Sequence, residues 1–312
     1  MSQEKENEKV SVQRYVDILS NGGFKALFGD RNNKDVVMSI LIALLPPDRQ
    51  VEDIEYMPTE YSGQTQENKD YRYDFMCHGP DGTSFIVETQ RYYESNWFRR
   101  CVSYASRMYD LQNPVGGDYS APPVYLIGLM GVEVNHPDRE LWRDRYISEY
   151  TFREKETHDL LDDTIFIIFA ELASFDKRQE ECVSDLDRML YLLKNTGNLK
   201  KRSSWLRREI YSRILDACEI ARFSKDKRIQ YNKDMIDERR RQGELDAAMK
   251  MGMEKGREEG REEGREEGIA KGREEGREEG KRAAIRTMLA AGVPVEEIAK
   301  AFSITEEECR KL

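Results

Sequence analysis

The chain has 312 residues, 50 basic and 60 acidic side chains, and a formal net charge of −10 at pH 7. This length fits one or two domains, and a composition that is 38% hydrophobic and 35% charged is more polar than that of an average globular domain. The longest apolar run, 36–45, stops at Pro46-Pro47 and is much shorter than the roughly 20 residues of a membrane-spanning helix, so we expect a cytoplasmic protein without a membrane partner.

Cysteine and histidine usage excludes several kinds of site. The five cysteines are far apart in the sequence and form no C-x-x-C pair, so neither a disulfide framework nor a zinc site is predicted. The three histidines lack metal-ligand spacing. Without a G-x-S-x-G elbow, a Ser/His/Asp triad is not predicted either.

The first predicted element follows a polar N-terminus, 1–12, that we expect to be disordered. Residues 24–45 predict a turn followed by a helix, with Asn33 as its N-cap and Pro46-Pro47 as its stop. At helical spacing this helix carries, on one face, the apolar side chains of Val37, Ile40, Leu41, Leu44 and Leu45.

A β-hairpin is predicted next, after a short strand at 51–57. Residues 70–77 alternate in a way that is typical of a strand, with tyrosine and phenylalanine on one face. GPDG at 79–82 is a strong turn signal. Residues 85–90, FIVETQ, are then the partner strand of the hairpin.

The following elements complete an α/β pattern. We predict a helix at 92–112, buried strands at 122–130 and 166–172, and helical segments from about 178 to 194 and from about 203 to 222. The order helix, strand, hairpin, helix, strand, strand predicts an α/β domain with a mixed sheet. We therefore divide this part of the chain into a core, 13–175, and a helical extension, 176–250.

Glycine recurs every four residues through a highly charged segment, 251–280, that has almost no apolar residues. Each internal glycine costs a helix about 1 kcal/mol relative to alanine, whereas the spacing of glutamate and arginine favours helical ion pairs. Two interpretations stay open, a solvated helix or a flexible charged spacer.

The last segment, 281–312, has the outline of a small helix-turn-helix module. Its first helix is expected to end at Ala291 with Gly292 as C-cap, Pro294 opens a second helix, and Thr305 begins a third with a capping box. Acidic residues stand where a DNA-reading helix would carry arginine or asparagine. We therefore favour self-association through these helices over DNA reading, and expect a homo-oligomer.

Three polar side chains on the predicted hairpin form the candidate active site. Glu88 and Gln90 are two residues apart and project from one face, and the turn brings Asp74 to them. Such an acidic pair suits Mg²⁺ or Mn²⁺, with the backbone carbonyl of Thr89 as a candidate third ligand. A metal ion here would lower the pKa of a bound water and polarise a phosphate, as phosphodiester hydrolysis requires. The spacing on its own arises often by chance.

The wider sequence pattern is more specific. FKALFGDRNNKDVVMSILIALL at 24–45, the K…D…DG…IVETQ block at 69–90, the helix with Arg99 and Arg100, and GGDYSAPPVYLIGLM at 116–130 follow in that order. Together with the glycine-punctuated tail, these segments resemble the Rpn family of recombination-promoting nucleases and putative transposases, a branch of the PD-(D/E)XK superfamily.

The resemblance implies a restriction-endonuclease-like fold and a divalent-metal-dependent DNA endonuclease that acts in recombination or transposition-like processes. It assigns Asp74 and Glu88 to the metal ion, while Gln90 stands where the superfamily usually has lysine. A neutral glutamine can orient a water or a phosphate oxygen but is no base near pH 7. Because the lysine charge is missing, we expect slower catalysis than in a lysine-containing relative.

Three basic residues are candidates for contact with DNA, namely Lys69, Arg99 and Arg100. The acidic pI of about 5.2 argues against tight non-specific binding to DNA at physiological salt. A second interpretation therefore stays open, in which the nuclease fold is weakly active or inactive and serves as a DNA-binding or oligomeric interaction module.

Overall fold

The computed structural model describes residues 13–61, 70–113, 116–199, 202 and 204–311. The disorder predicted for 1–12 and the candidate Lys69 therefore lie outside the described residues. The chain divides into two compact units, of which the first ends at Arg239 and the second begins at Arg240. No helix of the described residues is long and apolar enough to cross a membrane.

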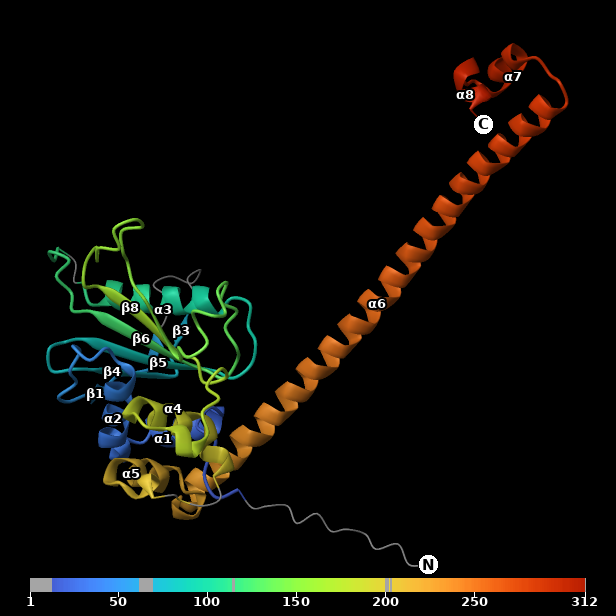
Figure 1. Cartoon of the computed structure of the whole chain (residues 1–312). Helices are drawn as coiled ribbons and strands as arrows, with labels where there is room; N and C mark the ends of the chain where they lie inside the picture. The colour runs from blue at the N-terminus through green and yellow to red at the C-terminus, as the bar shows by residue number, and fades with distance from the viewer. Residues whose placement is uncertain (1–12, 62–69, 114–115, 200–201, 203, 312) are drawn as a thin grey trace, which may run out of the picture. The chain divides into compact units, whose positions relative to one another are not determined.

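The first unit is built on a six-stranded mixed sheet, which confirms the predicted α/β class (Figure 1). The strands lie in the order β1 (Glu55–Tyr56), β4 (Phe75–His78), β5 (Ser84–Gln90), β6 (Val124–Met130), β8 (Ile165–Ala170) and β7 (Ile147–Tyr150). The three central strands β5, β6 and β8 are parallel, and the flanking strands β1, β4 and β7 pair antiparallel. A separate two-stranded ribbon consists of β2 (Glu60–Tyr61) and β3 (Tyr71–Arg72).

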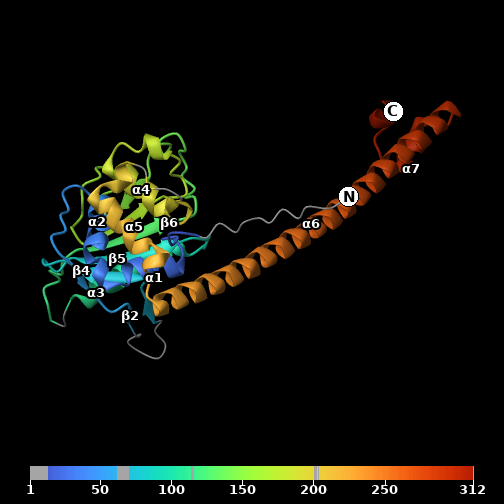
Figure 2. The ribbon, with the colours of Figure 1, turned by 90° about the horizontal axis from the view of Figure 1, so that it is seen from below.

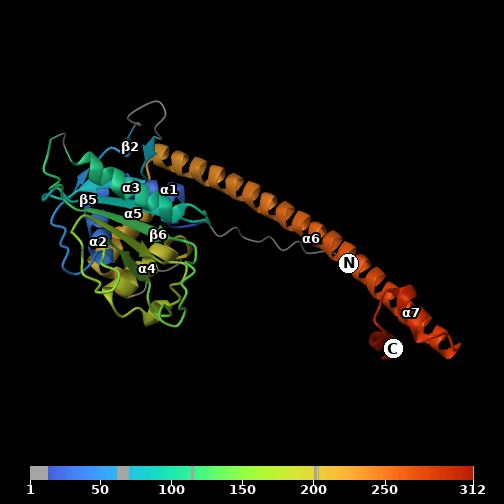
Figure 3. The same ribbon diagram turned by 90° about the horizontal axis from the view of Figure 1, so that it is seen from above.

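Helices cover both faces of this sheet, which explains why β6 and β8 are apolar along their whole length. Every residue of β6 and β8 is buried, as expected for parallel strands with both faces covered. Helix α3 (Trp97–Leu111) packs on one face, as the view from above shows (Figure 3). The other face carries, as the view from below shows, α1 (Asn21–Phe28), α2 (Lys34–Leu44), α4 (Asp185–Asn195) and α5 (Glu209–Cys218) (Figure 2).

The predicted helix within 24–45 is confirmed as α2, but the segment before it is a helix rather than a turn. Ser20 caps α1 by accepting a hydrogen bond from Gly23 N–H at 3.0 Å. A side chain at Gly23 would meet the carbonyl oxygen of Asp17 at 1.8 Å, so only glycine fits here. Asn33 is the N-cap of α2, yet its amide donates back to the carbonyl of Leu27 at 3.0 Å and so joins the two helices.

The prediction of one continuous strand over 70–77 was wrong. The chain bends at Tyr73–Asp74, so that β3 pairs with β2 while β4 pairs with β5. The physical reason is that the Tyr73 N–H donates to Thr59 (2.8 Å), and its ring packs against Tyr104 of α3 with centroids 4.8 Å apart. The alternating pattern continues through the bend, which is why the sequence did not reveal it.

Other boundaries also differ from the predictions. The GPDG turn is confirmed, with Gly82 at φ +83° and the Gly79 N–H bonded to Thr83 at 2.8 Å. The strand predicted at 51–57 is limited to β1, and the helix predicted from residue 92 starts at Trp97. No apolar alternation marks β7 in the sequence, because its buried position is occupied by Ser148 and its last two residues are exposed.

The helices after residue 176 share the core of the sheet rather than standing apart from it. Residues of α4 and α5 belong to the same buried cluster as those of α1 and α2, for example Leu190, Leu193, Ile214 and Leu215. Both helices are shorter than predicted, and short 3-10 turns flank them at Gln179–Glu181, Thr196–Asn198, Trp205–Arg207 and Ile220–Arg222. A further 3-10 turn, Arg31–Asn33, precedes α2.

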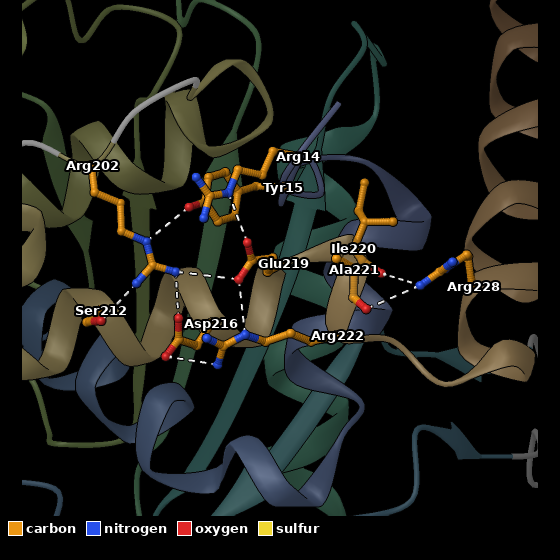
Figure 4. Close-up of polar contacts among 10 residues, drawn as sticks. All are labelled: Arg14, Tyr15, Arg202, Ser212, Asp216, Glu219, Ile220, Ala221, Arg222 and Arg228. Atoms are coloured by element: carbon orange, nitrogen blue, oxygen red, sulfur yellow. Dashed lines mark hydrogen bonds and ion pairs between the residues drawn. The ribbon is translucent and has the colours of Figure 1, made fainter. Parts of the chain in front are cut away.

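A charged network joins the beginning of the described chain to this helical layer (Figure 4). Tyr15 forms an antiparallel bridge with Glu219, and Arg202 donates both to the Tyr15 hydroxyl (3.0 Å) and to Asp216. Arg14 pairs with Glu219 at 2.9 Å. Segments that are about 200 residues apart in the sequence are thus bonded to each other in the first unit.

The glycine-punctuated repeat is helical in the structure. It lies inside α6 (Lys225–Ala290), a helix of 66 residues, so the solvated helix is the interpretation observed (Figure 1). Beyond Gly292, at φ +80°, α7 (Val295–Phe302) and α8 (Glu306–Arg310) follow, the latter with the predicted Thr305 capping box. The second unit has a small apolar core of its own that consists of Ile285, Ile298 and Cys309.

Candidate active site

The hairpin brings the two predicted acidic residues together. The β4–β5 ladder ends at the pair Phe75–Val87, so Asp74 and Glu88 are the next residues on each strand. The Asp74 N–H donates to Glu88 Oε1 at 2.9 Å. In return, Asp74 Oδ2 accepts hydrogen bonds from the Thr89 N–H at 2.9 Å and from the Thr89 hydroxyl at 3.1 Å. Backbone groups of one strand thus fix each carboxylate of the other.

The two carboxylates have very different surroundings. Asp74 is exposed, whereas Glu88 is only 2% exposed against the face covered by α3. Burial and the neighbouring Asp74 charge raise the pKa of Glu88 well above its ordinary value, although the Asp74 N–H and the Arg100 guanidinium act in the opposite direction. A buried acid beside a second carboxylate is stabilised by a proton or by a cation that both can share.

The donor set fits a hard divalent cation better than a transition metal with nitrogen or sulfur ligands. Among the described residues no group of three or more His, Cys, Asp or Glu side chains could hold a metal ion. Two carboxylates and water are the usual protein environment of Mg²⁺. In a strand, the N–H and C=O of one residue point to the same edge, so the Thr89 carbonyl lies on the edge that faces Asp74.

Gln90 is held at both ends of its amide. Its oxygen accepts a hydrogen bond from Arg100 Nη2 at 3.2 Å, and its nitrogen donates to the backbone carbonyl of Tyr92. A guanidinium can only donate and a carbonyl can only accept, so these partners fix the orientation of the amide. With 6% of its surface exposed, Gln90 connects the end of β5 to α3 rather than presenting a free amide.

Two of the predicted DNA-contacting residues, Arg99 and Arg100, differ in their exposure and in their partners. Arg99 is exposed on α3, whereas Arg100 is half-buried and bonded to Glu94 at 2.7 Å. Arg91, the residue after Gln90, pairs with Asp17 at 2.8 Å and with Glu238 at 3.2 Å.

Sequence reasoning missed the aromatic residues around the acidic pair. Trp97 is buried, and the Arg100 guanidinium lies over its ring at 4.7 Å from the centroid. The rings of Tyr73 and Tyr104 pack against each other with centroids 4.8 Å apart, and burial together with the Glu88 charge raises the pKa of Tyr104. The three-residue spacing of Trp97 and Arg100 on one helix was a signal that could have paired them.

His136, Ser148 and Glu171 form a hydrogen-bonded cluster that differs from a serine-hydrolase triad. His136 Nε2 and the Ser148 hydroxyl each bind the buried Glu171 carboxylate at 2.8 Å. The serine hydroxyl donates to the acid and not to the histidine, whereas a nucleophilic serine would donate to the histidine.

Comparison with known proteins identifies the family. The model of the PD-(D/E)XK nuclease family transposases matches residues 21–248, which include the sheet, both helical layers and the first part of α6. Neither curated proteins nor solved structures gave a match. Since the family model covers well over half of the chain, this chain belongs to the PD-(D/E)XK nuclease family transposases.

Proposed function

We propose that the chain is a divalent-metal-dependent DNA endonuclease in which Asp74 and Glu88 hold Mg²⁺ or Mn²⁺. The observation that carries the proposal is the convergence of one exposed and one buried carboxylate at the end of two paired strands. A buried acid whose pKa is raised by burial and by a like charge is costly unless a ligand offsets it. Family membership favours DNA as the substrate and a recombination or transposition-like role in the cytoplasm.

The residues around the two acids hold both carboxylates in fixed positions. When bound, a divalent cation supplies Lewis acidity toward a phosphate oxygen and a more acidic water. Thr89 holds Asp74 through two hydrogen bonds, and the Asp74 N–H holds Glu88, so neither acid has to reorganise when a ligand arrives. We propose that the exposed Arg99 on α3 and Lys69 contact the DNA backbone. We also propose that the core, residues 13–175, contains the residues that hydrolyse the phosphodiester bond.

The test is cleavage of supercoiled plasmid with Mg²⁺ or Mn²⁺ by the wild type, Asp74→Asn and Glu88→Gln. A matched control is Asp110→Asn, which removes an exposed acid of α3 that pairs with Arg107 in the same helix. We expect both site variants to lose cleavage while the control keeps it. Equal cleavage by all four proteins would contradict the assignment of Asp74 and Glu88 to the active site.

One observation favours the alternative of a nuclease fold that binds DNA without cutting. Gln90 is neutral and both ends of its amide are engaged, so it offers no free positive group to a phosphate. Calorimetric titration with Mn²⁺ separates the two functions, because an inactive site should bind the metal no better than Asp74→Asn does.

The C-terminal unit is proposed to mediate self-association. Its apolar core is small, and Val295 and Phe302 of α7 are only partly covered. Light scattering of the full chain and of a chain truncated after Arg240 tests this proposal. An unchanged number of subunits after truncation would contradict it.

A further inference from the structure

Arg100 lies beside the acidic pair in a setting unlike that of a surface arginine. Its guanidinium donates to Gln90 Oε1 at 3.2 Å and to Glu94 Oε2 at 2.7 Å, and it lies over the ring of Trp97. Gln90 is two residues from Glu88 on the same face of β5, so the charge stands next to the proposed metal site. The side chain is held on three sides and keeps little freedom.

Two buried N–H groups in this setting lack an acceptor within the part of the chain that the structure describes. Arg100 Nε and Trp97 Nε1 are both buried, and neither has a hydrogen-bond partner among the described residues. Trp97 is only 2% exposed, so water does not readily replace a partner for its indole N–H. Buried donors are nearly always paired in folded proteins, so a ligand that brings acceptor oxygens to this place beside the acidic pair would satisfy both N–H groups.

We propose that Arg100 supplies the positive charge that contacts the scissile phosphate, and that Gln90 is the residue that positions Arg100. The inference rests on the proposed endonuclease function and deepens it. The neutral amide of Gln90 cannot itself supply a positive charge to a phosphate, but it binds an arginine of α3 that can. A guanidinium suits the task because it is always charged and can present parallel N–H groups to a phosphate.

The neighbouring Arg99 provides the matched comparison. It carries the same charge on the same helix, but it is exposed and no pairing with the site residues is observed among the described residues. An arginine that only attracts the DNA backbone changes the concentration of DNA needed for half-maximal cleavage. An arginine that contacts the reacting phosphate changes the rate of the bound complex.

The experiment uses the full chain and a duplex DNA substrate with Mg²⁺, and measures kcat and KM separately. The variants are Arg100→Gln, Arg100→Lys, Arg99→Gln and the double variant Arg100→Gln/Gln90→Lys. Mn²⁺ binding without DNA is measured by calorimetry, and thermal unfolding shows that each variant folds.

We expect Arg100→Gln to lower kcat about 100-fold with little change in KM, since loss of one preorganised donor to a developing charge has effects of that size. Arg100→Lys should keep more activity than Arg100→Gln, because the charge remains. The double variant should have a kcat at least about tenfold higher than that of Arg100→Gln, because it places a cation on the strand. Arg99→Gln should alter KM alone, and Mn²⁺ binding should persist in every variant.

Several results would overturn the inference. If Arg100→Gln cleaves like the wild type while Asp74→Asn is inactive, the metal site stands and the role of Arg100 does not. Equal losses in Arg100→Gln and Arg100→Lys, together with lost Mn²⁺ binding, would show that the residue serves only packing. If the wild type cleaves with neither metal ion, the endonuclease proposal fails first and this inference falls with it.

Discussion

Glu88→Gln is expected to make the metal-free protein more stable while it abolishes cleavage. The Glu88 carboxyl is 2% exposed, lies beside Asp74, and has its pKa raised well above the ordinary value of 4.5. For an acid whose pKa is raised on folding, the protonated form favours the folded state. Stability is therefore highest below the unfolded-state pKa and falls as the pH rises through the folded-state pKa.

The size of the change in stability follows from the removal of the buried Glu88 charge. Leaving a buried polar group poorly compensated costs about 1–3 kcal/mol. For a unit of this size each kcal/mol shifts the melting temperature by about 2–4 °C. At pH 8 in EDTA we therefore expect the Gln variant to melt several degrees above the wild type, and the difference to shrink at pH 5.

Calorimetric or fluorescence-monitored unfolding with and without Mn²⁺ is the assay. Saturating Mn²⁺ should reverse the order, since about 100 Kd of a ligand stabilises the folded state by about 2.7 kcal/mol and the variant lacks a metal ligand. A Gln variant that is less stable than the wild type at pH 8 in EDTA would refute the reasoning, because Glu88 would then be a net stabilising group.

Three further outcomes follow from other parts of the structure. Arg91→Met should lower the free energy of unfolding by about 1–3 kcal/mol in chemical denaturation, because it leaves the buried Glu238 and the nearby Asp17 without their cation. The control is Arg99→Met, at an exposed site, which should change the free energy of unfolding little. Gly82→Ala should lower the melting temperature and cost about 1 kcal/mol, because Gly82 has φ +83° and an added Cβ would lie 2.8 Å from Pro122; unchanged melting would contradict the turn geometry. Gly260→Ala and Gly264→Ala should each stabilise α6 by about 1 kcal/mol and raise the helical circular dichroism signal, because a Cβ there meets nothing; a loss of signal would mean that these glycines pack against something.

The sheet and its acidic pair could be predicted because local pattern and chemistry agree there. The turn at 79–82 sets the hairpin, and a two-residue period fixes that Glu88 and Gln90 share a face. The continuous apolar runs of β6 and β8 indicate strands covered on both sides. These features depend on neighbours in the sequence.

The features that the sequence did not reveal depend on contacts between distant segments. The bend at Tyr73–Asp74 follows from pairing with the ribbon β2–β3 and from packing on α3. Edge strand β7 lacks a burial pattern that would mark it. The engagement of Gln90 by Arg100 joins a strand to a helix across the β5–α3 connection, and periodicity carries no information on such a bond.

Anomalous scattering from a crystal of the full chain soaked with Mn²⁺ would show whether Asp74 and Glu88 share one metal ion. We expect one peak within about 2–2.5 Å of a carboxylate oxygen of both Asp74 and Glu88. The absence of a peak there at saturating Mn²⁺, or a peak held by other residues alone, would contradict it.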